Sequence, residues 1–248
     1  MYSILSPVES PDQTRGRAVA GPILCYHRVG EVAVEGTRHN TPPRQLRSHI
    51  RFFYRLNYRF IRAVDFEGDL PVRCVCFTFD DGWLSAIENG LPFFYDLGLA
   101  ATIYVATDMV GSRSGLAKDD LGEIANWQHL RTVSIRGLEI GNHTARHIPL
   151  TRLSKEAALE DVLAAKRALE ERNFTKHTFA YPGGLVPVFS REILALAGYP
   201  VAVSLRPGPV CSDSDMSALP RLHMSSKDSL PRLIYRTFYQ GRVRTLFK

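Results

Sequence analysis

Short apolar runs alternate with longer amphipathic stretches along most of this 248-residue chain. The apolar runs predict strands, whereas stretches whose apolar residues recur every three or four positions predict helices. Strands are predicted at residues 22–26, 59–64, 72–79, 101–106, 138–140, 178–181 and 201–205. Helices are predicted at residues 84–97, 127–135 and 153–172, the last with Ser154 as its N-cap, and one more starts at Thr41-Pro42-Pro43 and extends to Leu56. This alternation is typical of an α/β protein with a parallel sheet.

The chain divides into three parts by composition. Residues 1–20 are polar and contain proline and glycine, and this composition predicts a flexible N-terminal arm. Residues 21–225 hold the predicted strands and helices and have the length of one α/β domain. In residues 226–248, basic side chains alternate with apolar and aromatic ones. This tail fits either a basic amphipathic helix on a membrane surface or a last helix that docks on the domain.

Composition and charge narrow the class of protein. Apolar residues make up 45% of the chain, which is enough for a full core and argues against disorder. The formal net charge of +6 favours contact with an anionic glycolipid or a membrane surface, and no nucleic-acid-binding motif accompanies it. No apolar run approaches the ~20 residues of a membrane-spanning helix. The N-terminus also lacks the apolar core of a secretory signal.

Four cysteines are present: Cys25, Cys74, Cys76 and Cys211. The first three lie in apolar, strand-like runs, and Cys74 and Cys76, two residues apart, should share one face of a strand. This setting predicts buried apolar side chains and not disulfide partners or zinc ligands. Together with the expected lack of a secretory signal, it indicates a reduced cytoplasmic location, with peripheral membrane contact as the alternative.

Side chains that could take part in catalysis follow the ends of predicted strands. Asp80 and Asp81 follow the apolar run of residues 72–79, and two imidazoles, His143 and His147, follow a later strand. One carboxylate with two imidazoles is a common ligand set for a catalytic divalent metal, with a position left open for water. The remaining carboxylate would then lie beside that water, where a general base is needed. A metal-dependent hydrolase is indicated, with its site at the carboxyl ends of the strands.

A set of segments around these residues occurs in a characteristic order. In sequence they are Ile23-Leu24-Cys25-Tyr26-His27-Arg28-Val29, Thr78-Phe79-Asp80-Asp81-Gly82, Leu91-Pro92-Phe93-Phe94, Ala101-Thr102-Ile103-Tyr104-Val105, Leu138-Glu139-Ile140-Gly141, His143-Thr144-Ala145-Arg146-His147 and Phe179-Ala180-Tyr181-Pro182-Gly183-Gly184. Over roughly residues 20–225 this order resembles the polysaccharide deacetylases, a carbohydrate esterase family. The resemblance implies an irregular (β/α) barrel of about seven parallel strands in a single α/β domain. Strand counting alone does not give that architecture.

The resemblance also implies roles for individual residues. Asp80 resembles the catalytic base of the family, and Asp81, His143 and His147 resemble its metal ligands. His223 is a looser match to the late histidine that acts as the general acid. Zn²⁺ suits such a mixed nitrogen and oxygen site, and Co²⁺, Ni²⁺ or Fe²⁺ could also serve.

Other matching positions concern substrate binding. Trp127 resembles the aromatic residue that lines the site, and Tyr181, Pro182 and Gly183 resemble the groove segment whose backbone N–H stabilises the oxyanion. His27 either lines the site or is a core histidine. The remaining histidines, His39, His49, His129 and His177, are expected to be ordinary surface residues.

One position departs from the family pattern. Many family members have an arginine where this chain has Ala180, and that arginine orients the base. In this chain the role is either vacant or filled by Arg221 or Arg28.

Three functions remain open from the sequence. The resemblance implies a metal-dependent hydrolase that removes N-acetyl groups from an N-acetylhexosamine in a glycan or a lipid-linked sugar. A hydrolase of another amide, imide or O-acetyl ester could use the same scaffold, because a fold does not fix a substrate. A glycan-binding protein that has kept the fold without the chemistry is the third alternative.

Overall fold

The computed structural model describes residues 18–31, 39–69, 71–113, 122–175 and 178–239. Most of the expected N-terminal arm and the end of the tail, residues 240–248, therefore lie outside the described residues. Val19–Gly21 forms a strand, β1, which pairs antiparallel with β11 (Val210–Cys211). A second small pair joins β3 (Arg28–Val29) to β4 (Asn40–Thr41).

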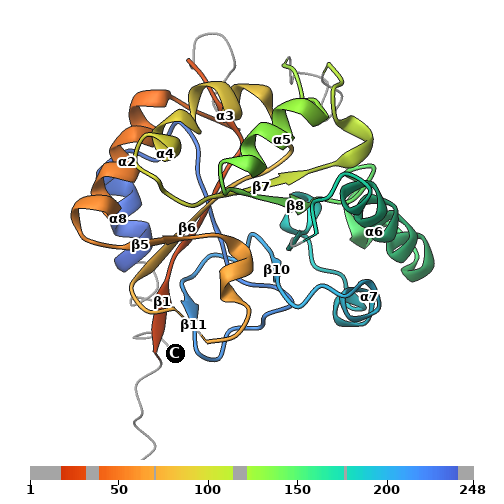
Figure 1. The fold of residues 1–248 in the computed structure, drawn as a ribbon. Helices are drawn as coiled ribbons and strands as arrows, with labels where there is room; N and C mark the ends of the chain where they lie inside the picture. The colour runs from red at the N-terminus through yellow and green to blue at the C-terminus, as the bar shows by residue number, and fades with distance from the viewer. Residues whose placement is uncertain (1–17, 32–38, 70, 114–121, 176–177, 240–248) are drawn as a thin grey trace, which may run out of the picture.

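The centre of the molecule is a parallel sheet (Figure 1). Its strands are β2 (Ile23–Tyr26), β5 (Arg59–Ile61), β6 (Cys74–Phe79), β7 (Thr102–Val105), β8 (Glu139–Asn142), β9 (Phe179–Ala180), β10 (Ala202–Val203) and β12 (Leu222–His223). The order is β10, β9, β8, β7, β6, β2, β12, with β5 beside the first half of β6. All of these pairs are parallel, so the expected irregular barrel of about seven parallel strands is confirmed.

Residues 219–223 connect the two ends of this sheet. Leu219 forms a parallel bridge with Val203 of β10, and β12 pairs with β2 only three residues later. The strand β12 was not predicted from the sequence, because it is too short to show a hydrophobic period. This segment matters for the site, because it carries Arg221 and His223 across the barrel.

Helices surround the strands. They are α2 (Pro43–Arg55), α3 (Leu84–Asn89), α4 (Pro92–Tyr95), α5 (Trp127–Ile135), α6 (Lys155–Glu170), α7 (Ser190–Ala197) and α8 (Leu230–Phe238). Short 3₁₀ turns lie between them: η1 (Ala63–Phe66), η2 (Thr107–Met109), η3 (Leu150–Arg152) and η4 (Pro182–Gly184). Helices α2, α3, α4 and α8 lie together on one side of the sheet, and α6 and α7 lie on another (Figure 1).

Two sequence predictions need correction. The single helix predicted at residues 84–97 is broken into α3 and α4, because Pro92 lacks the N–H that would continue the first helix. The strand predicted at 59–64 ends at Ile61 and continues as η1. The predicted cap is confirmed, since the Ser154 hydroxyl accepts a 3.2 Å hydrogen bond from the N–H of Ala157.

The side chains of strand β6 point alternately into two apolar cores. Val75, Phe77 and Phe79 pack in the cluster beneath the helices. Cys74 and Cys76 point the other way, into the barrel interior, as their spacing predicts. All four cysteines are buried. The same alternation continues past the strand end, so Thr78 and Asp80 should also face the interior.

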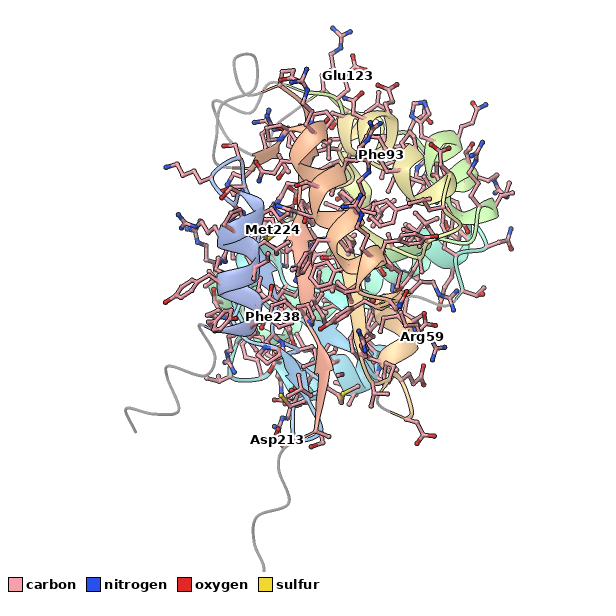
Figure 2. The ribbon with its side chains drawn as sticks, turned by 90° about the vertical axis from the view of Figure 1, so that its left-hand side faces the viewer. Arg59, Phe93, Glu123, Asp213, Met224 and Phe238 are labelled. Atoms are coloured by element: carbon pink, nitrogen blue, oxygen red, sulfur yellow. The ribbon has the colours of Figure 1, made fainter. Side chains whose placement is uncertain are left out.

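The described part of the C-terminal tail docks on the domain. Leu233 of α8 is fully buried, and the ring of Phe238 lies 6.2 Å from that of Phe52 on α2. Figure 2 shows Phe238 at the end of α8, beside the barrel. The apolar side of this helix is therefore already covered by α2. None of the helices among the described residues is long and apolar enough to cross a membrane.

A buried carboxylate ties three strands together. Glu139 of β8 accepts hydrogen bonds from Thr102 Oγ1 on β7, from both the N–H and Oγ1 of Thr178 before β9, and from the N–H of Val64 in η1, at 2.7–3.0 Å. Burial raises the pKa of this carboxyl, and the donors partly oppose that shift. Removing the carboxylate would leave buried donors without an acceptor.

Replacing Glu139 with Ala should therefore lower the free energy of unfolding by about 3 kcal/mol, because unsatisfied buried donors are expensive. Urea denaturation followed by circular dichroism measures this. The matched control is Glu171→Ala, which removes an exposed carboxylate and should change stability by under about 0.5 kcal/mol. Equal effects of the two changes would contradict the role assigned to Glu139.

Candidate active site

The three expected metal ligands converge at the carboxyl ends of β6 and β8. Oδ1 of Asp81 lies 3.5 Å from Nε2 of His143 and 3.1 Å from Nε2 of His147. One ligand atom from each residue lies within 4.8 Å of the others. Asp81 Oδ1 is buried and accepts no hydrogen bond of good geometry. A buried carboxylate oxygen and two imidazole nitrogens aimed at one point fit a divalent cation.

The backbone around these ligands adopts unusual conformations. Asp81, Thr144 and His147 have φ values of 71°, 67° and 58°, in the left-handed region that residues other than glycine rarely enter. Such strain persists only where the surroundings impose it, and it is commonly found at functional sites. The turn at Asp81 is what directs its carboxylate away from that of Asp80.

Hydrogen bonds hold the histidine loop in place. The Asn142 side chain accepts from the N–H of Thr144 at 2.7 Å, and Thr144 Oγ1 accepts from the N–H of His147 at 3.0 Å. Nδ1 of His143 donates to the carbonyl of Ala180 at 2.7 Å, which leaves its Nε2 for the cluster. A ligating histidine is usually oriented by such a bond at its other nitrogen. Ala180, where the family has arginine, thus contributes through its backbone.

Of the two candidate arginines, Arg221 is the one that contacts Asp80. This side chain has no exposed surface, and it donates two hydrogen bonds of 2.7 Å to the two oxygens of Asp80. It also bonds Thr78 Oγ1 and the carbonyl of Ser204. The other candidate, Arg28, lies over the ring of Trp83. Thiol Sγ of Cys25 donates to Asp80 Oδ2 at 3.3 Å, which adds a further contact.

The two aspartates have different electrostatic surroundings. Burial opposes the ionisation of both. For Asp80 the guanidinium of Arg221 outweighs burial and lowers the pKa to about 2. For Asp81 the imidazoles of His143 and His147 hold the pKa well below its usual range. Both carboxylates are therefore ionised near neutral pH, one paired with arginine and one facing the proposed ligands.

Two further histidines lie beside the ligand cluster. Nε2 of His27 is 4.0 Å from Asp81 Oδ2, so His27 lies at the cluster and is also nearly buried. The rings of His27 and His223 have centroids 5.3 Å apart. Burial lowers the pKa of His27 to about 4 and shifts that of His223 in the same direction. His223 is thus brought to the site by β12, although its motif match was loose.

The aromatic residue that contacts a proposed ligand is not the expected one. Trp127 stacks with Phe174, and the guanidinium of Arg172 lies 4.1 Å from its ring. Instead, Nε1 of Trp83 donates a 3.0 Å hydrogen bond to Asp81 Oδ2. The sequence signal for this contact is the position of Trp83, two residues after Asp81.

The groove segment at residues 181–183 follows β9. Tyr181 is buried, and its hydroxyl donates to the carbonyl of Ser217 at 2.8 Å. Pro182 is buried as well, whereas Gly183 is exposed in a left-handed conformation, with φ of 65°. Of these three residues, only Gly183 is exposed.

The expectation that four other histidines are ordinary surface residues is wrong for two of them. His49 is fully buried on α2, where its Nδ1 lies 2.9 Å from the Tyr26 hydroxyl. His39 lies against His27 and His223, with ring centroids 4.8 and 5.4 Å away. His49 lies on the buried stripe of α2 with Leu46 and Phe53, so its helical spacing is the sequence signal for its burial. For His39 there is no such signal, because only folding brings it to the site. His129 takes part in the capping box of α5, and His177 lies outside the described residues.

The chain belongs to the polysaccharide deacetylase family, whose family profile matches residues 67–202. Two relatives align over most of the chain. One is YxkH of Bacillus subtilis, named as a polysaccharide deacetylase, which is 24% identical over 82% of this chain and 71% of its own length. Another is the poly-β-1,6-N-acetyl-D-glucosamine N-deacetylase of Staphylococcus epidermidis, 23% identical over 85% of this chain and 81% of its own.

Solved structures share the fold. The deacetylase PplD of Streptococcus pyogenes superimposes with a TM-score of 0.75, at 19% identity, over 88% of this chain and 98% of that one. IcaB of Ammonifex degensii superimposes with a TM-score of 0.73, at 24% identity, over 87% of this chain and 96% of that one. At these identities the similarity concerns the fold alone.

The buried Asp80–Arg221 ion pair leads to a prediction about the stability of the protein. Arg221→Met should lower the free energy of unfolding by about 3 to 5 kcal/mol, because it leaves a buried carboxylate without its partner. The double change with Asp80→Asn should lose less than the sum of the two single changes, since the unpaired charge is then absent. Urea denaturation of the four proteins gives this coupling.

The control for that experiment is the exposed pair between Arg191 and Asp215, whose nitrogen and oxygen are 3.0 Å apart. Arg191→Met should change stability by under about 1 kcal/mol. Additive effects of Arg221→Met and Asp80→Asn would show that the two side chains do not depend on each other.

Proposed function

We propose that this chain is a metal-dependent N-deacetylase that removes acetyl groups from N-acetylhexosamine units of a glycan. The observation that carries the proposal is the convergence of Asp81, His143 and His147 beside Asp80, which Arg221 holds. The Staphylococcus epidermidis relative is named for N-deacetylation of poly-β-1,6-N-acetyl-D-glucosamine, so oligomers of that sugar are the first substrates to test. Lipid-linked N-acetylhexosamines are the second class.

Asp81, His143 and His147 are the proposed metal ligands. Their mixed oxygen and nitrogen donors suit Zn²⁺, and Co²⁺, Ni²⁺ or Fe²⁺ fit the same set. A divalent cation held there would acidify a bound water and polarise the acetyl carbonyl. The protein contributes the orientation of the donors, through Ala180 for His143 and through Thr144 for His147.

Asp80 is the proposed general base. Its Oδ2 lies 4.0 Å from Nε2 of His143, so this oxygen faces the ligands and can accept a proton from water placed between them. Although burial opposes ionisation, Arg221 lowers the pKa of this carboxyl to about 2, so it is ionised near neutral pH, as a general base must be. Arg221 keeps the carboxylate ionised and fixes its plane.

The departing amine needs a proton, and His223 is the proposed donor. Nε2 of His223 is buried and has no hydrogen-bond partner among the described residues, so no bond within that part of the chain competes for it. The backbone N–H of Gly183 is the proposed donor to the oxyanion. His27, Trp127, Tyr181 and Pro182 remain proposed contributors to the substrate groove.

Substitutions should separate metal binding from catalysis. Asp81→Asn should lose bound metal and acetate release together, because it removes a ligand charge. Asp80→Asn should keep about one metal per chain while acetate release falls roughly 100- to 10,000-fold, because only the proton acceptor is changed. Elemental analysis and an acetate assay on N-acetylglucosamine oligomers measure both quantities.

The control is Asp96→Asn, which changes an exposed aspartate at the end of α4 and should leave metal and activity unaltered. Metal binding without acetate release from any N-acetylated sugar would favour a hydrolase of another amide, imide or O-acetyl ester. Sugar binding without metal would favour the glycan-binding alternative.

We also propose that the face formed by α2 and α8 contacts an anionic membrane surface. Arg44, Arg47, Arg51 and Arg55 recur every three or four residues along α2 and are all exposed. They line a shallow groove of about 400 Å³ whose floor includes Phe52, Leu56 and Leu230. Among the described residues no carboxylate pairs with these four arginines, and neither helix contains an acidic residue.

The apolar content of this face favours a lipid surface over a dissolved polyanion. Tyr54 of α2 and Tyr235 of α8 are each about half exposed among the arginines. Arginine beside tyrosine and leucine is the composition of surfaces that rest in a lipid headgroup layer. Since the apolar side of α8 is already covered by α2, the contact would be a shallow one.

The combined change Arg44→Gln, Arg47→Gln and Arg51→Gln should weaken binding to vesicles that contain anionic lipid by about a hundredfold, at ~1 kcal/mol for each arginine. Vesicle sedimentation at low and high salt measures it. The matched control is Arg152→Gln, Arg167→Gln and Arg191→Gln, which removes the same charge from the α6 and α7 side. Equal loss in both triple variants would show a net-charge effect, and no loss in either would remove the proposal.

A further inference from the structure

A second group of imidazoles lies next to the proposed metal ligands. His27 follows β2, His39 precedes β4, and His223 ends β12, so the three come from distant parts of the chain. One ring nitrogen from each lies within 4.8 Å of the others. Their ring centroids are 4.8–5.4 Å apart, and the rings are tilted or edge-on to one another. We call these residues the histidine trio.

Two members of the trio present buried nitrogen atoms that nothing in the protein satisfies. Nδ1 of His27 and Nε2 of His223 have no hydrogen-bond partner among the described residues. Buried polar atoms are normally bonded, and exceptions often mark a position for a ligand, an ion or water. The other nitrogen of His27 faces Asp81 Oδ2 at 4.0 Å, which leaves Nδ1 directed to the trio.

We propose that His27, His39 and His223 bind a second divalent cation of the kind that prefers imidazole, such as Zn²⁺, Ni²⁺ or Cu²⁺. Three imidazoles with one open position form a known type of zinc site. Nitrogens bound at ~2.1 Å in a tetrahedron are about 3.4 Å apart, so the trio must contract by up to about 1.4 Å. Small rotations of the three imidazole side chains, of which that of His39 is partly exposed, would supply that movement.

The surrounding charges favour a cation at the trio. The three imidazoles bring no charge of their own when they are neutral. Asp81 lies between the two sites, with Oδ1 toward His143 and His147 and Oδ2 toward His27. A carboxylate behind a ligating histidine is a common arrangement at metal sites, because it orients the ring and raises its basicity. Asp81 would therefore support both cations.

Occupation of the trio has a consequence that rests on the proposed function. His223 Nε2 is the atom proposed to carry the proton to the departing amine. A cation bound at this nitrogen takes the lone pair that the proton needs, so the second cation inhibits. Acetate release should rise as the first site fills with Zn²⁺ and fall at higher concentrations as the trio fills.

His39→Gln tests the second site without touching the proposed catalytic residues. After equilibrium dialysis against excess Zn²⁺, elemental analysis should find two zinc ions per chain in the wild type and one in His39→Gln. His143→Ala should lose the first ion and keep the second. His129→Gln, the matched control on α5, should still bind two. Circular dichroism checks that each variant is folded.

Acetate release is then measured on the same proteins at increasing Zn²⁺ concentration. His39→Gln should release acetate at the wild-type rate in low Zn²⁺. It should need at least a roughly tenfold higher Zn²⁺ concentration for half-inhibition, because one ligand of the trio is gone. A single zinc per wild-type chain at excess, or two in His39→Gln, would overturn the second site. If no acetate is released by any protein, the proposed deacetylation fails, but zinc stoichiometry still decides the trio.

Discussion

The rest of the site depends on the buried ion pair between Asp80 and Arg221. Both side chains are almost fully enclosed, and two hydrogen bonds of 2.7 Å join them. A charge in such surroundings is tolerated only when it is paired and fully hydrogen-bonded. Thr78 and the Ser204 carbonyl provide the remaining bonds to the guanidinium. The pair therefore fixes residues 219–223 against β6, and this same segment closes the sheet and carries His223.

Because Arg221 holds Asp80, the two adjacent aspartates have different partners. Asp80 continues the inward alternation of β6 and meets Arg221 in the barrel interior. Asp81 turns out of the strand with a φ of 71° and meets the histidines that follow β8. Side chains of neighbouring residues in a strand point to opposite faces. Only the sharp turn after Phe79 lets both carboxylates line one site while each keeps its own partner.

Much of the architecture could be read from the chain because apolar runs and helical periods report it directly. The cysteines of β6 faced the interior as their spacing predicts, and Ser154 capped α6. The strand β12 could not be predicted, because two residues are too few to show a pattern. It pairs with β2, and the preceding Arg221 bonds to Asp80 after β6. The single helix expected at residues 84–97 is interrupted before Pro92, and α4 begins at that proline.

The kind of site could be predicted from the amino-acid sequence, because Asp80, Asp81, His143 and His147 lie in motifs whose order is informative. It left open which arginine contacts Asp80, and it placed His39 and His49 on the surface. Only the tertiary structure put Arg221 against Asp80, Trp83 against Asp81, and His39 beside His27 and His223. The physical reason is distance along the chain. Local patterns report which face of an element is buried, but contacts between residues far apart in sequence depend on how the barrel closes.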